Sequence, residues 1–480
     1  MNLLDQLKQN STISNTKGGR YYSTTYNANL DIFCGVSRYN PTEEIITKFK
    51  NALDEDKELA LANLLYLLDI REGKGERLLF KTMFRYLCQN ERELALKILP
   101  FISEYGRWDY VLEGIDTLID NEVVDLIKKQ LDLDKTSSNP SLLAKWLPSV
   151  KNHDVRNIMA FTLRKKLGLK EKDYRLLLTG IRSKLNLIEK NLTNRDYQSI
   201  DFEKVPTKAM LKYRNSFSRN CAEKYSNYLK EVKAGNKKIN TKGLFAYEII
   251  RNILIGAYSN EKELYDVMWN NQKNILDGCK SNILVMADTS GSMTIHNYVP
   301  LANSIGLAIY IAERNTGIFK NHFLTFSEEP RLQEIKGSNI AEKVNNIKPI
   351  ISNTDIDKAF ELLLETACQN NISKEEMPEF IIIISDMEFD NGVYSKNGTN
   401  FSGWKRNFKD KGFELPKIIF WNVACDTLGV PTTKFEQDVA MISGFSTNVL
   451  ENLFNIENYS PVKIMLETLE KYRKLLQEVA

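Results

Sequence analysis

Several residue types and motifs that define whole classes of protein are scarce in this chain of 480 residues. Its six cysteines form no Cys-x-x-Cys pair and it has only three histidines, so we expect neither a zinc site nor a disulfide framework. Unbroken apolar runs are short, as at Phe380–Ile384 and Leu307–Ala312, whereas a membrane-spanning helix needs about 20 residues. The opening residues carry an early acid and lack the apolar core of a secretory signal. We therefore expect a cytoplasmic protein that has no contact with a membrane.

The motifs of two common enzyme chemistries are missing as well. Ser290 lacks the Gly-x-Ser-x-Gly elbow of a hydrolase, and the nearby His296 is of a type that lies more often on the surface than in a catalytic site. The glycine-containing stretch Gly73–Glu76 lacks the spacing and the Lys-Ser/Thr pair of a phosphate-binding loop, so we interpret it as a turn between helices. The sequence thus predicts a protein without catalytic activity.

From about residue 42 to 280 the apolar residues recur at helical spacing, and Pro and Gly fall mainly at breaks. In Glu76–Cys88, for example, one stripe is formed by Leu79, Phe80, Met83, Phe84, Leu87 and Cys88. Segments of similar length follow one another, at residues 54–69, 76–89, 91–104, 107–131, 141–150 and 153–167. This pattern predicts stacked helical hairpins, in the manner of an irregular HEAT-like solenoid, although no strict repeat period is present.

Near residue 281 short runs rich in β-branched and aromatic residues begin, at residues 282–287, 323–326, 380–385 and 418–423, with a weaker one at 438–446. Helical stretches at residues 299–314, 338–348, 355–370 and 402–411 alternate with them. This alternation predicts a doubly wound α/β domain with mostly parallel strands. We expect four parts: an N-terminal arm (1–40), an all-α helical repeat domain (41–280), the α/β domain (281–458) and a C-terminal amphipathic helix (459–480).

Oxygen-bearing side chains follow two of the expected strands. The first strand runs into Asp288, Ser290 and Ser292 in the form Asp-x-Ser-x-Ser, Asp386 ends the strand at 380–385, and Thr354 precedes a helix. In open α/β sheets, ligands lie outside the carboxyl ends of the strands, and hard oxygen donors suit Mg²⁺ or Mn²⁺. An alternative is that these Ser and Asp residues merely cap helices.

These five residues, in this order, resemble the metal-ion-dependent adhesion site (MIDAS) of von Willebrand A domains. The resemblance implies that Ser290, Ser292 and Thr354 contact the metal, that Asp288 and Asp386 act partly through water, and that an acidic group from outside completes the shell. It also implies a Rossmann-like fold for the α/β domain.

The middle of the chain is basic. Residues 151–250 hold 23 Lys and Arg against 10 Asp and Glu, a net charge of +13, within a chain of net charge +3. Such a block indicates a polyanionic partner, or else a solvated helical surface that is basic for solubility. Helical spacing places Arg175 and Arg182 on one outward face, opposite the buried Leu178, Ile181, Leu185 and Ile188. The candidate RNA-binding residues are Arg164, Lys165, Arg175, Arg182, Lys208, Lys212, Tyr213, Arg214 and Arg219.

Residues 170–220, together with the motifs REGKGERLLF, SEYGRWDYVL and SLLAKWLPS, resemble a family of uncharacterised proteins of phages, large viruses, fungi and plants. That family is itself similar to the TROVE proteins, typified by the Ro ribonucleoprotein. The resemblance implies a HEAT-like ring or horseshoe closed by a von Willebrand A domain, monomeric, that binds small structured RNA and the single-stranded ends of misfolded RNA. The alternative function is a protein-interaction scaffold whose metal site binds an acidic residue of a partner.

Overall fold

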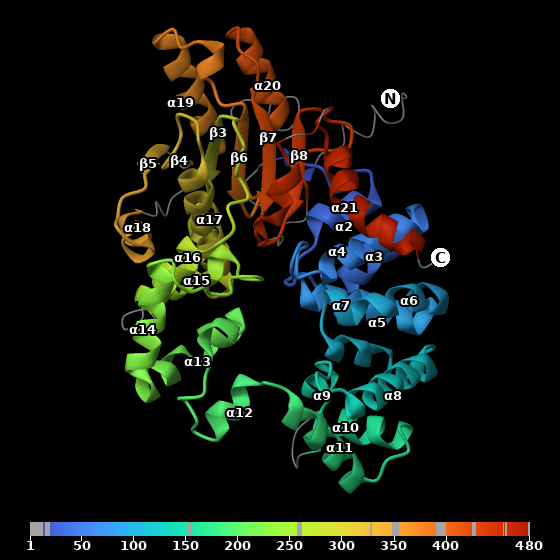
Figure 1. The fold of residues 1–480 in the computed structure, drawn as a ribbon. Coiled ribbons are helices and arrows are strands. Elements are labelled where there is room, and N and C mark those ends of the chain that lie inside the picture. The colour runs from blue at the N-terminus through green and yellow to red at the C-terminus, as the bar shows by residue number, and fades with distance from the viewer. Residues whose placement is uncertain are drawn as a thin grey trace. The chain divides into compact units, whose positions relative to one another are not determined.

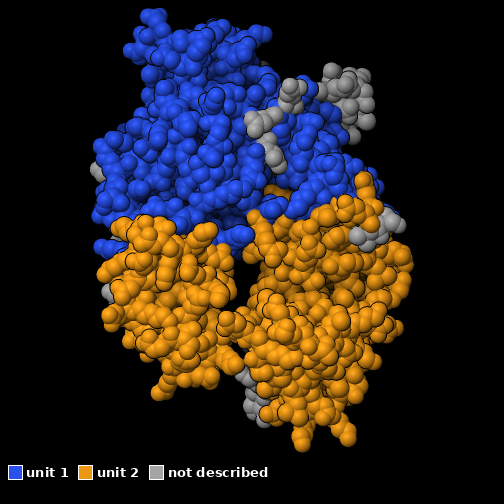
Figure 2. Space-filling model, in the orientation of Figure 1, with its two compact units in different colours: residues 1–63, 72–74, 241–474 blue, residues 64–71, 75–240, 475–480 orange. Residues whose placement is uncertain are grey.

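The computed structural model describes residues 13–14, 20–150, 156–256, 262–326, 329–347, 355–389, 400–424, 429–454, 456 and 458–478. They form a mixed α/β protein in which a helical region precedes a sheet of mostly parallel strands (Figure 1). The predicted class is confirmed at this level, whereas the HEAT-like type of repeat stays a prediction. Internal contacts separate two compact units: unit 1 comprises residues 1–63, 72–74 and 241–474, and unit 2 comprises residues 64–71, 75–240 and 475–480 (Figure 2).

The sheet of unit 1 has the strand order β5-β4-β3-β6-β7-β8. Its strands are β3 (Ile283–Ala287), β4 (His322–Thr325), β5 (Arg331–Glu334), β6 (Phe380–Ser385), β7 (Lys417–Asn422) and β8 (Val439–Ser443). All neighbours are parallel except β4 and β5, which are antiparallel. The order runs outward from β3 in both directions, so β3 and β6 flank the point at which the chain switches sides.

The amino-acid composition of each strand explains whether it could be predicted from the sequence. Every residue of β3, β6 and β8 is buried, and their β-branched and aliphatic runs are typical of parallel strands covered on both faces. Strand β5 was not predicted, because its sequence is RLQE and none of its residues is buried. An exposed antiparallel strand at the edge of a sheet needs no apolar run.

The remaining elements of unit 1 are mostly helical. They are β1 (Ile13–Ser14), β2 (Arg20–Tyr21), α2 (Ala28–Gly35), α3 (Thr42–Glu55), α15 (Ala246–Leu254), α16 (Lys262–Asn270), α17 (Ile295–Arg314), α18 (Ile340–Asn346), α19 (Ile356–Gln369), α20 (Asn400–Asp410) and α21 (Pro461–Glu478), the last reaching into unit 2. Helix α4 (Lys57–Leu68) is shared by the two units. Among the residues described, no helix has the length and apolar character that crossing a bilayer requires.

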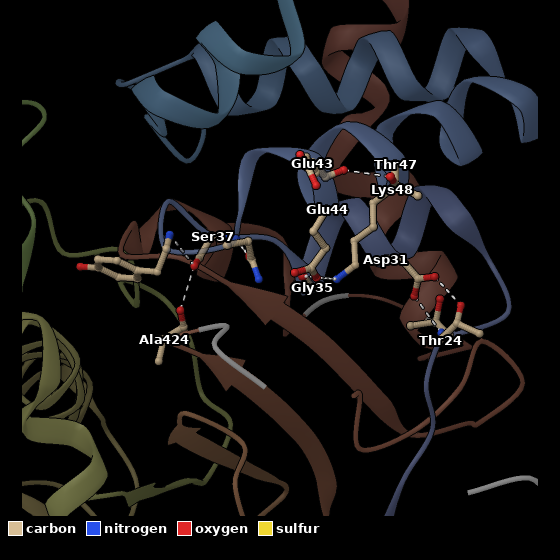
Figure 3. Close-up of polar contacts among 12 residues, drawn as sticks. Thr24, Asp31, Gly35, Ser37, Glu43, Glu44, Thr47, Lys48 and Ala424 are labelled. Atoms are coloured by element: carbon tan, nitrogen blue, oxygen red, sulfur yellow. Dashed lines mark hydrogen bonds and ion pairs between the residues drawn. The ribbon is translucent and has the colours of Figure 1, made fainter. Parts of the chain in front are cut away.

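The N-terminal helices of unit 1 are fixed to the carboxyl edge of its sheet. Ser37 Oγ donates to the carbonyl oxygen of Ala424, just after β7, at 2.9 Å (Figure 3). Phe389 N donates to the Tyr21 hydroxyl at 2.7 Å, and the buried Lys74 Nζ donates to Ser443 Oγ at 2.8 Å. These bonds join described N-terminal residues and Lys74 to the sheet within unit 1.

Unit 2 is helical throughout the part that is described. Its elements are α5 (Arg77–Asn90), α6 (Arg92–Ile98), α7 (Ile102–Tyr105), α8 (Asp120–Thr136), α9 (Leu143–Trp146), α10 (Arg156–Lys166), α11 (Glu171–Lys184), α12 (Ile188–Thr193), α13 (Thr207–Asn220) and α14 (Ala222–Lys233), with 3-10 turns η1 (Leu99–Phe101), η2 (Trp108–Gly114) and η3 (Phe202–Lys204). The predicted stripe of α5 is confirmed, since all six of its apolar residues are buried.

One predicted helical segment, residues 107–131, is divided in the structure. The 3-10 turn η2 ends at Gly114, and α8 begins only at Asp120. A Cβ atom on Gly114 would lie 2.6 Å from Val123 Cγ2, so the chain passes α8 there at a distance that only glycine permits. Asp116 then adopts a positive φ of 56°, which ends any continuous helix.

Candidate metal centre and nucleic-acid interface

The two aspartates of the candidate metal centre lie side by side at the switch point of the sheet. Ala287 of β3 pairs with Ile384 of β6, and Asp288 N donates to the Ile384 carbonyl oxygen at 2.9 Å. Asp288 is fully buried and Asp386 is 4% exposed. Crevices at such switch points are the usual ligand sites of open α/β sheets.

Hydroxyl groups surround these carboxylates. Ser290 N donates to Asp288 Oδ1 at 2.8 Å, and the Oγ atoms of Ser290 and Ser292 are 3.0 Å apart. Ser385 Oγ donates to Asp288 Oδ2 at 2.7 Å and lies 3.4 Å from Asp386 Oδ1. Sequence reasoning missed Ser385, whose signal was a lone hydroxyl that ends an otherwise aliphatic strand. Thr354 lies outside the described residues.

The carboxylates of the centre lack compensation by a cation of the part of the protein that the structure describes. Burial, and next the charge of Asp386, raise the pKa of Asp288 from its usual 3.8 to about 7. Within the described residues neither aspartate has a Lys or Arg partner. Two adjacent buried carboxylates without a counter-charge are costly, and a divalent cation bound between them would remove that cost.

The donor set fits a hard cation, and the capping alternative does not account for Ser290, whereas Asp288 and Asp386 each accept a hydrogen bond from the backbone N–H two residues on. Ser290 stands at the N-cap of the 3-10 turn η4 (Gly291–Thr294), yet its side chain makes no capping hydrogen bond. No group of three or more His, Cys, Asp and Glu side chains is placed to hold a metal within the described residues, so hydroxyl and water oxygens would have to complete the shell. Mg²⁺ accepts such ligands, because it readily keeps several waters.

The candidate RNA-binding residues divide into two groups in unit 2. The exposed ones are Lys165, Arg175, Lys208, Lys212 and Arg219, and the half-buried ones are Arg164, Arg182, Tyr213 and Arg214. Within the described residues no ion pair joins Lys165, Arg175, Lys212 or Arg219 to an acid, whereas the neighbouring Lys166 is paired with Asp116 and Asp120 at 2.9 and 2.8 Å. Part of the basic surface therefore carries positive charge that no acid of the described residues neutralises.

The outward orientation predicted for Arg182 is wrong. Its guanidinium donates to the carbonyl oxygens of Ala144 and Leu147 and to Ser149 Oγ, at 2.7 to 2.8 Å. Burial lowers the pKa of this guanidinium. Arg182 is thus a positioning residue that joins α11 to α9 and the segment after it, and three of its N–H groups are already bonded within the protein.

We expect Arg182→Ala to lower the free energy of unfolding by about 3 kcal/mol, because three charge-assisted hydrogen bonds are lost together. Chemical denaturation followed by circular dichroism measures this change. Arg175→Ala is the matched control: it lies two turns earlier on α11 and is exposed, so its effect should stay within about 0.5 kcal/mol. Equal stability of the two variants would contradict the structural role of Arg182.

Arg164 and Arg214 are also partly occupied by backbone oxygens. Arg214 Nη1 donates to the carbonyl oxygen of Leu211 at 2.5 Å, and Arg164 Nη1 donates to that of Leu169 at 3.4 Å. Lys212 Nζ lies 4.9 Å from the centre of the Tyr213 ring. The structure therefore leaves the exposed lysines and arginines as the stronger candidates for phosphate contacts.

Comparisons with known proteins divide the chain near the start of β3, whereas the two compact units divide it at residue 241. Residues 123–282 match a family described as a domain of unknown function (DUF2828), and residues 282–474 match another, also a domain of unknown function (DUF7788). The uncharacterized protein L728 of Acanthamoeba polyphaga mimivirus is 29% identical over 500 residues, covering 95% of this chain and 86% of that protein. The predicted resemblance to uncharacterised proteins of large viruses is thereby confirmed.

A solved structure with similarity along most of the chain is the crystal structure of the Deinococcus radiodurans RO (RSR) protein. The similarity covers 94% of this chain and 99% of that one, with 12% sequence identity and a TM-score of 0.37, too low to establish a common fold. The sequence of this chain is similar to two families of unknown function, which meet at residue 282, one residue before β3 begins.

Proposed function

We propose that this protein binds RNA through the basic surface of unit 2. The observation that carries the proposal is the set of exposed cations without an ion-pair partner among the described residues, in a region of net charge +13. Side chains of this kind neutralise phosphates and release the counterions condensed on them, which makes binding strongly dependent on salt. Lys166 is paired with Asp120, whereas its neighbour Lys165 has no ion-pair partner among the described residues. A surface that was basic only for solubility would not need such unpaired cations.

The resemblance to Ro-type proteins extends the proposal to the class of RNA, namely small structured RNA or the single-stranded ends of misfolded RNA. Purification of the protein from its native host at low salt, followed by sequencing of the bound nucleic acid, tests this. Defined small or aberrant RNAs that are released at high salt are the expected result. Bound DNA, or no nucleic acid at all, would contradict it.

We further propose that Asp288, Ser290, Ser292 and Asp386, with Thr354, hold Mg²⁺ or Mn²⁺. The centre is supported by the burial of the two adjacent carboxylates, which have no Lys or Arg partner among the described residues. When bound, the cation would supply positive charge and an open coordination position. The second candidate function uses that position: an acidic side chain of a protein partner would complete the shell, with no catalytic step.

Ser290→Ala and Ser292→Ala should each weaken Mn²⁺ binding by at least about tenfold, because even changes outside the ligand shell commonly cost that much. Isothermal titration calorimetry of the purified chain measures the affinity. Thr294→Ala is the control, since its hydroxyl belongs to the same loop but donates to the Gly291 carbonyl oxygen at 2.7 Å. Serine variants that bind Mn²⁺ as tightly as the control variant would remove these hydroxyls from the centre.

A further inference from the structure

Helix α10 of unit 2 carries an exposed aromatic and aliphatic pair within its basic sequence. Ile158 is 71% exposed and Phe161 is 46% exposed. They are three residues apart, and Lys165 lies four residues after Phe161, so all three side chains share one helix face. Single exposed apolar residues are ordinary, but here the ring is combined with positive charge.

Two cations lie against the Phe161 ring. Arg164 Cζ is 4.6 Å and Lys165 Nζ is 4.5 Å from the ring centre. Neither cation has an ion-pair partner among the described residues; Arg164 Nη1 donates only a long hydrogen bond, of 3.4 Å, to the Leu169 carbonyl oxygen, and its Nε is buried without an acceptor. A buried donor without an acceptor, such as Arg164 Nε, is destabilising. The positive charges of Arg164 and Lys165 also repel each other. Among the described residues, the cluster therefore has two cations and no acid to pair with them.

A second cluster in the same unit shows what a completed arrangement looks like. Arg107 Cζ lies 3.8 Å from the centre of the Trp146 ring. There the guanidinium also makes a two-pronged contact with Asp109, at 2.8 and 2.6 Å, so the charge is neutralised within the protein. The Phe161 cluster has the ring and the cations, but not the acid.

We propose that Phe161 is a base-stacking position for single-stranded RNA, with the adjacent phosphate bound by Arg164 and Lys165. The inference rests on the proposed RNA binding and adds a particular site to it. A nucleobase offers a flat π-face to the exposed part of the ring and its phosphate offers the missing acceptor oxygens. The occupant is recognised by stacking and charge, so binding at this position is tolerant of base sequence.

Fluorescence anisotropy with a fluorescein-labelled 20-nucleotide oligouridine tests the site in the full chain. Phe161→Ala should weaken binding about 5- to 150-fold, the range expected for loss of one stacked base, without changing the salt slope. Phe161→Trp should restore or strengthen binding. Arg164→Gln combined with Lys165→Gln should instead reduce the salt slope by about 1.4, because two phosphate contacts to a single strand are lost.

Leu176→Ala is the matched control, since Leu176 is 61% exposed on the next helix, α11, and its truncation removes a similar apolar surface. Phe161→Ala that binds oligouridine as tightly as this control would overturn the site, and loss of a co-purifying protein in that variant would assign the patch to a protein partner instead. A native chain that binds no RNA at any salt concentration would overturn the proposed function itself.

Discussion

Asp288→Asn is expected to make the protein more stable than the native chain in EDTA at pH 8, by an amount on the order of a few kcal/mol. Burial and Asp386 raise the pKa of Asp288 from 3.8 to about 7, and each pKa unit corresponds to about 1.4 kcal/mol. The native chain at pH 8 must ionise this carboxyl at that cost. Asparagine is isosteric and carries no charge. Its Oδ1 still accepts the hydrogen bond that Ser290 N donates, while its Nδ2 replaces the oxygen that accepts from Ser385 Oγ, so that hydroxyl has to rotate and become the acceptor.

The same shift fixes the direction of the pH dependence. The unfolded carboxyl releases its proton near pH 4 and the folded one near pH 7, so the folded state binds more protons between these values. The free energy of unfolding of the native chain in EDTA should therefore fall as the pH rises from about 4 to about 7. The fall should be much smaller in Asp288→Asn. Urea denaturation at a series of pH values measures both curves.

Bound metal is expected to make the native chain more stable than Asp288→Asn, the reverse of their order in EDTA. Mn²⁺ should stabilise the native chain at pH 8, because it binds the ionised carboxylates and not the unfolded chain, and it should leave Asp288→Asn unchanged. Asp277→Asn, at an exposed position of the same unit, controls for the loss of one negative charge. Protection of Asp288→Asn by Mn²⁺ equal to that of the native chain would exclude Asp288 as a ligand.

The sequence was sufficient to place the carboxylates of this centre. A fully buried parallel strand is an aliphatic run, and the polar residue that follows it must lie at the carboxyl edge of the sheet. That reasoning located Asp288 and Asp386, and the pairing of β3 with β6 brings them together. It could not locate Ser385, because which side chains of a strand end face a neighbouring carboxylate depends on the register between strands.

Helical periodicity likewise identified the buried face of α11 but not the fate of its boundary residue. Leu178, Ile181, Leu185 and Ile188 are buried as predicted, although α11 ends at Lys184, so Leu185 follows it and Ile188 begins α12. Arg182 lies next to that face, and whether such a residue meets solvent or protein depends on what packs there. In this structure α9 and the segment after it supply three acceptors, a tertiary contact across more than 30 residues that no local pattern encodes.

Neutralising three exposed cations of unit 2 should weaken RNA binding on the order of 100-fold at low salt and make the salt slope shallower by about 2. The variant combines Arg175→Gln, Lys212→Gln and Arg219→Gln, whose side chains are exposed and have no ion-pair partner among the described residues. Each lost phosphate contact to a single strand removes about 0.7 from the slope. Titration of oligouridine at 50 to 300 mM KCl measures both quantities.

A control variant has to distinguish the effect of the chain's total charge on RNA binding from the effect of where the charges lie. A second variant with Lys320→Gln, Lys409→Gln and Lys411→Gln loses the same three charges from exposed positions of unit 1. If phosphates contact unit 2, this control should bind with nearly the native affinity and slope, because charges beyond about 10 Å are largely screened at 0.1 M salt. Equal losses in the two variants would mean that RNA responds only to net charge, and the basic surface of unit 2 would then be a solvated helical face rather than a binding site.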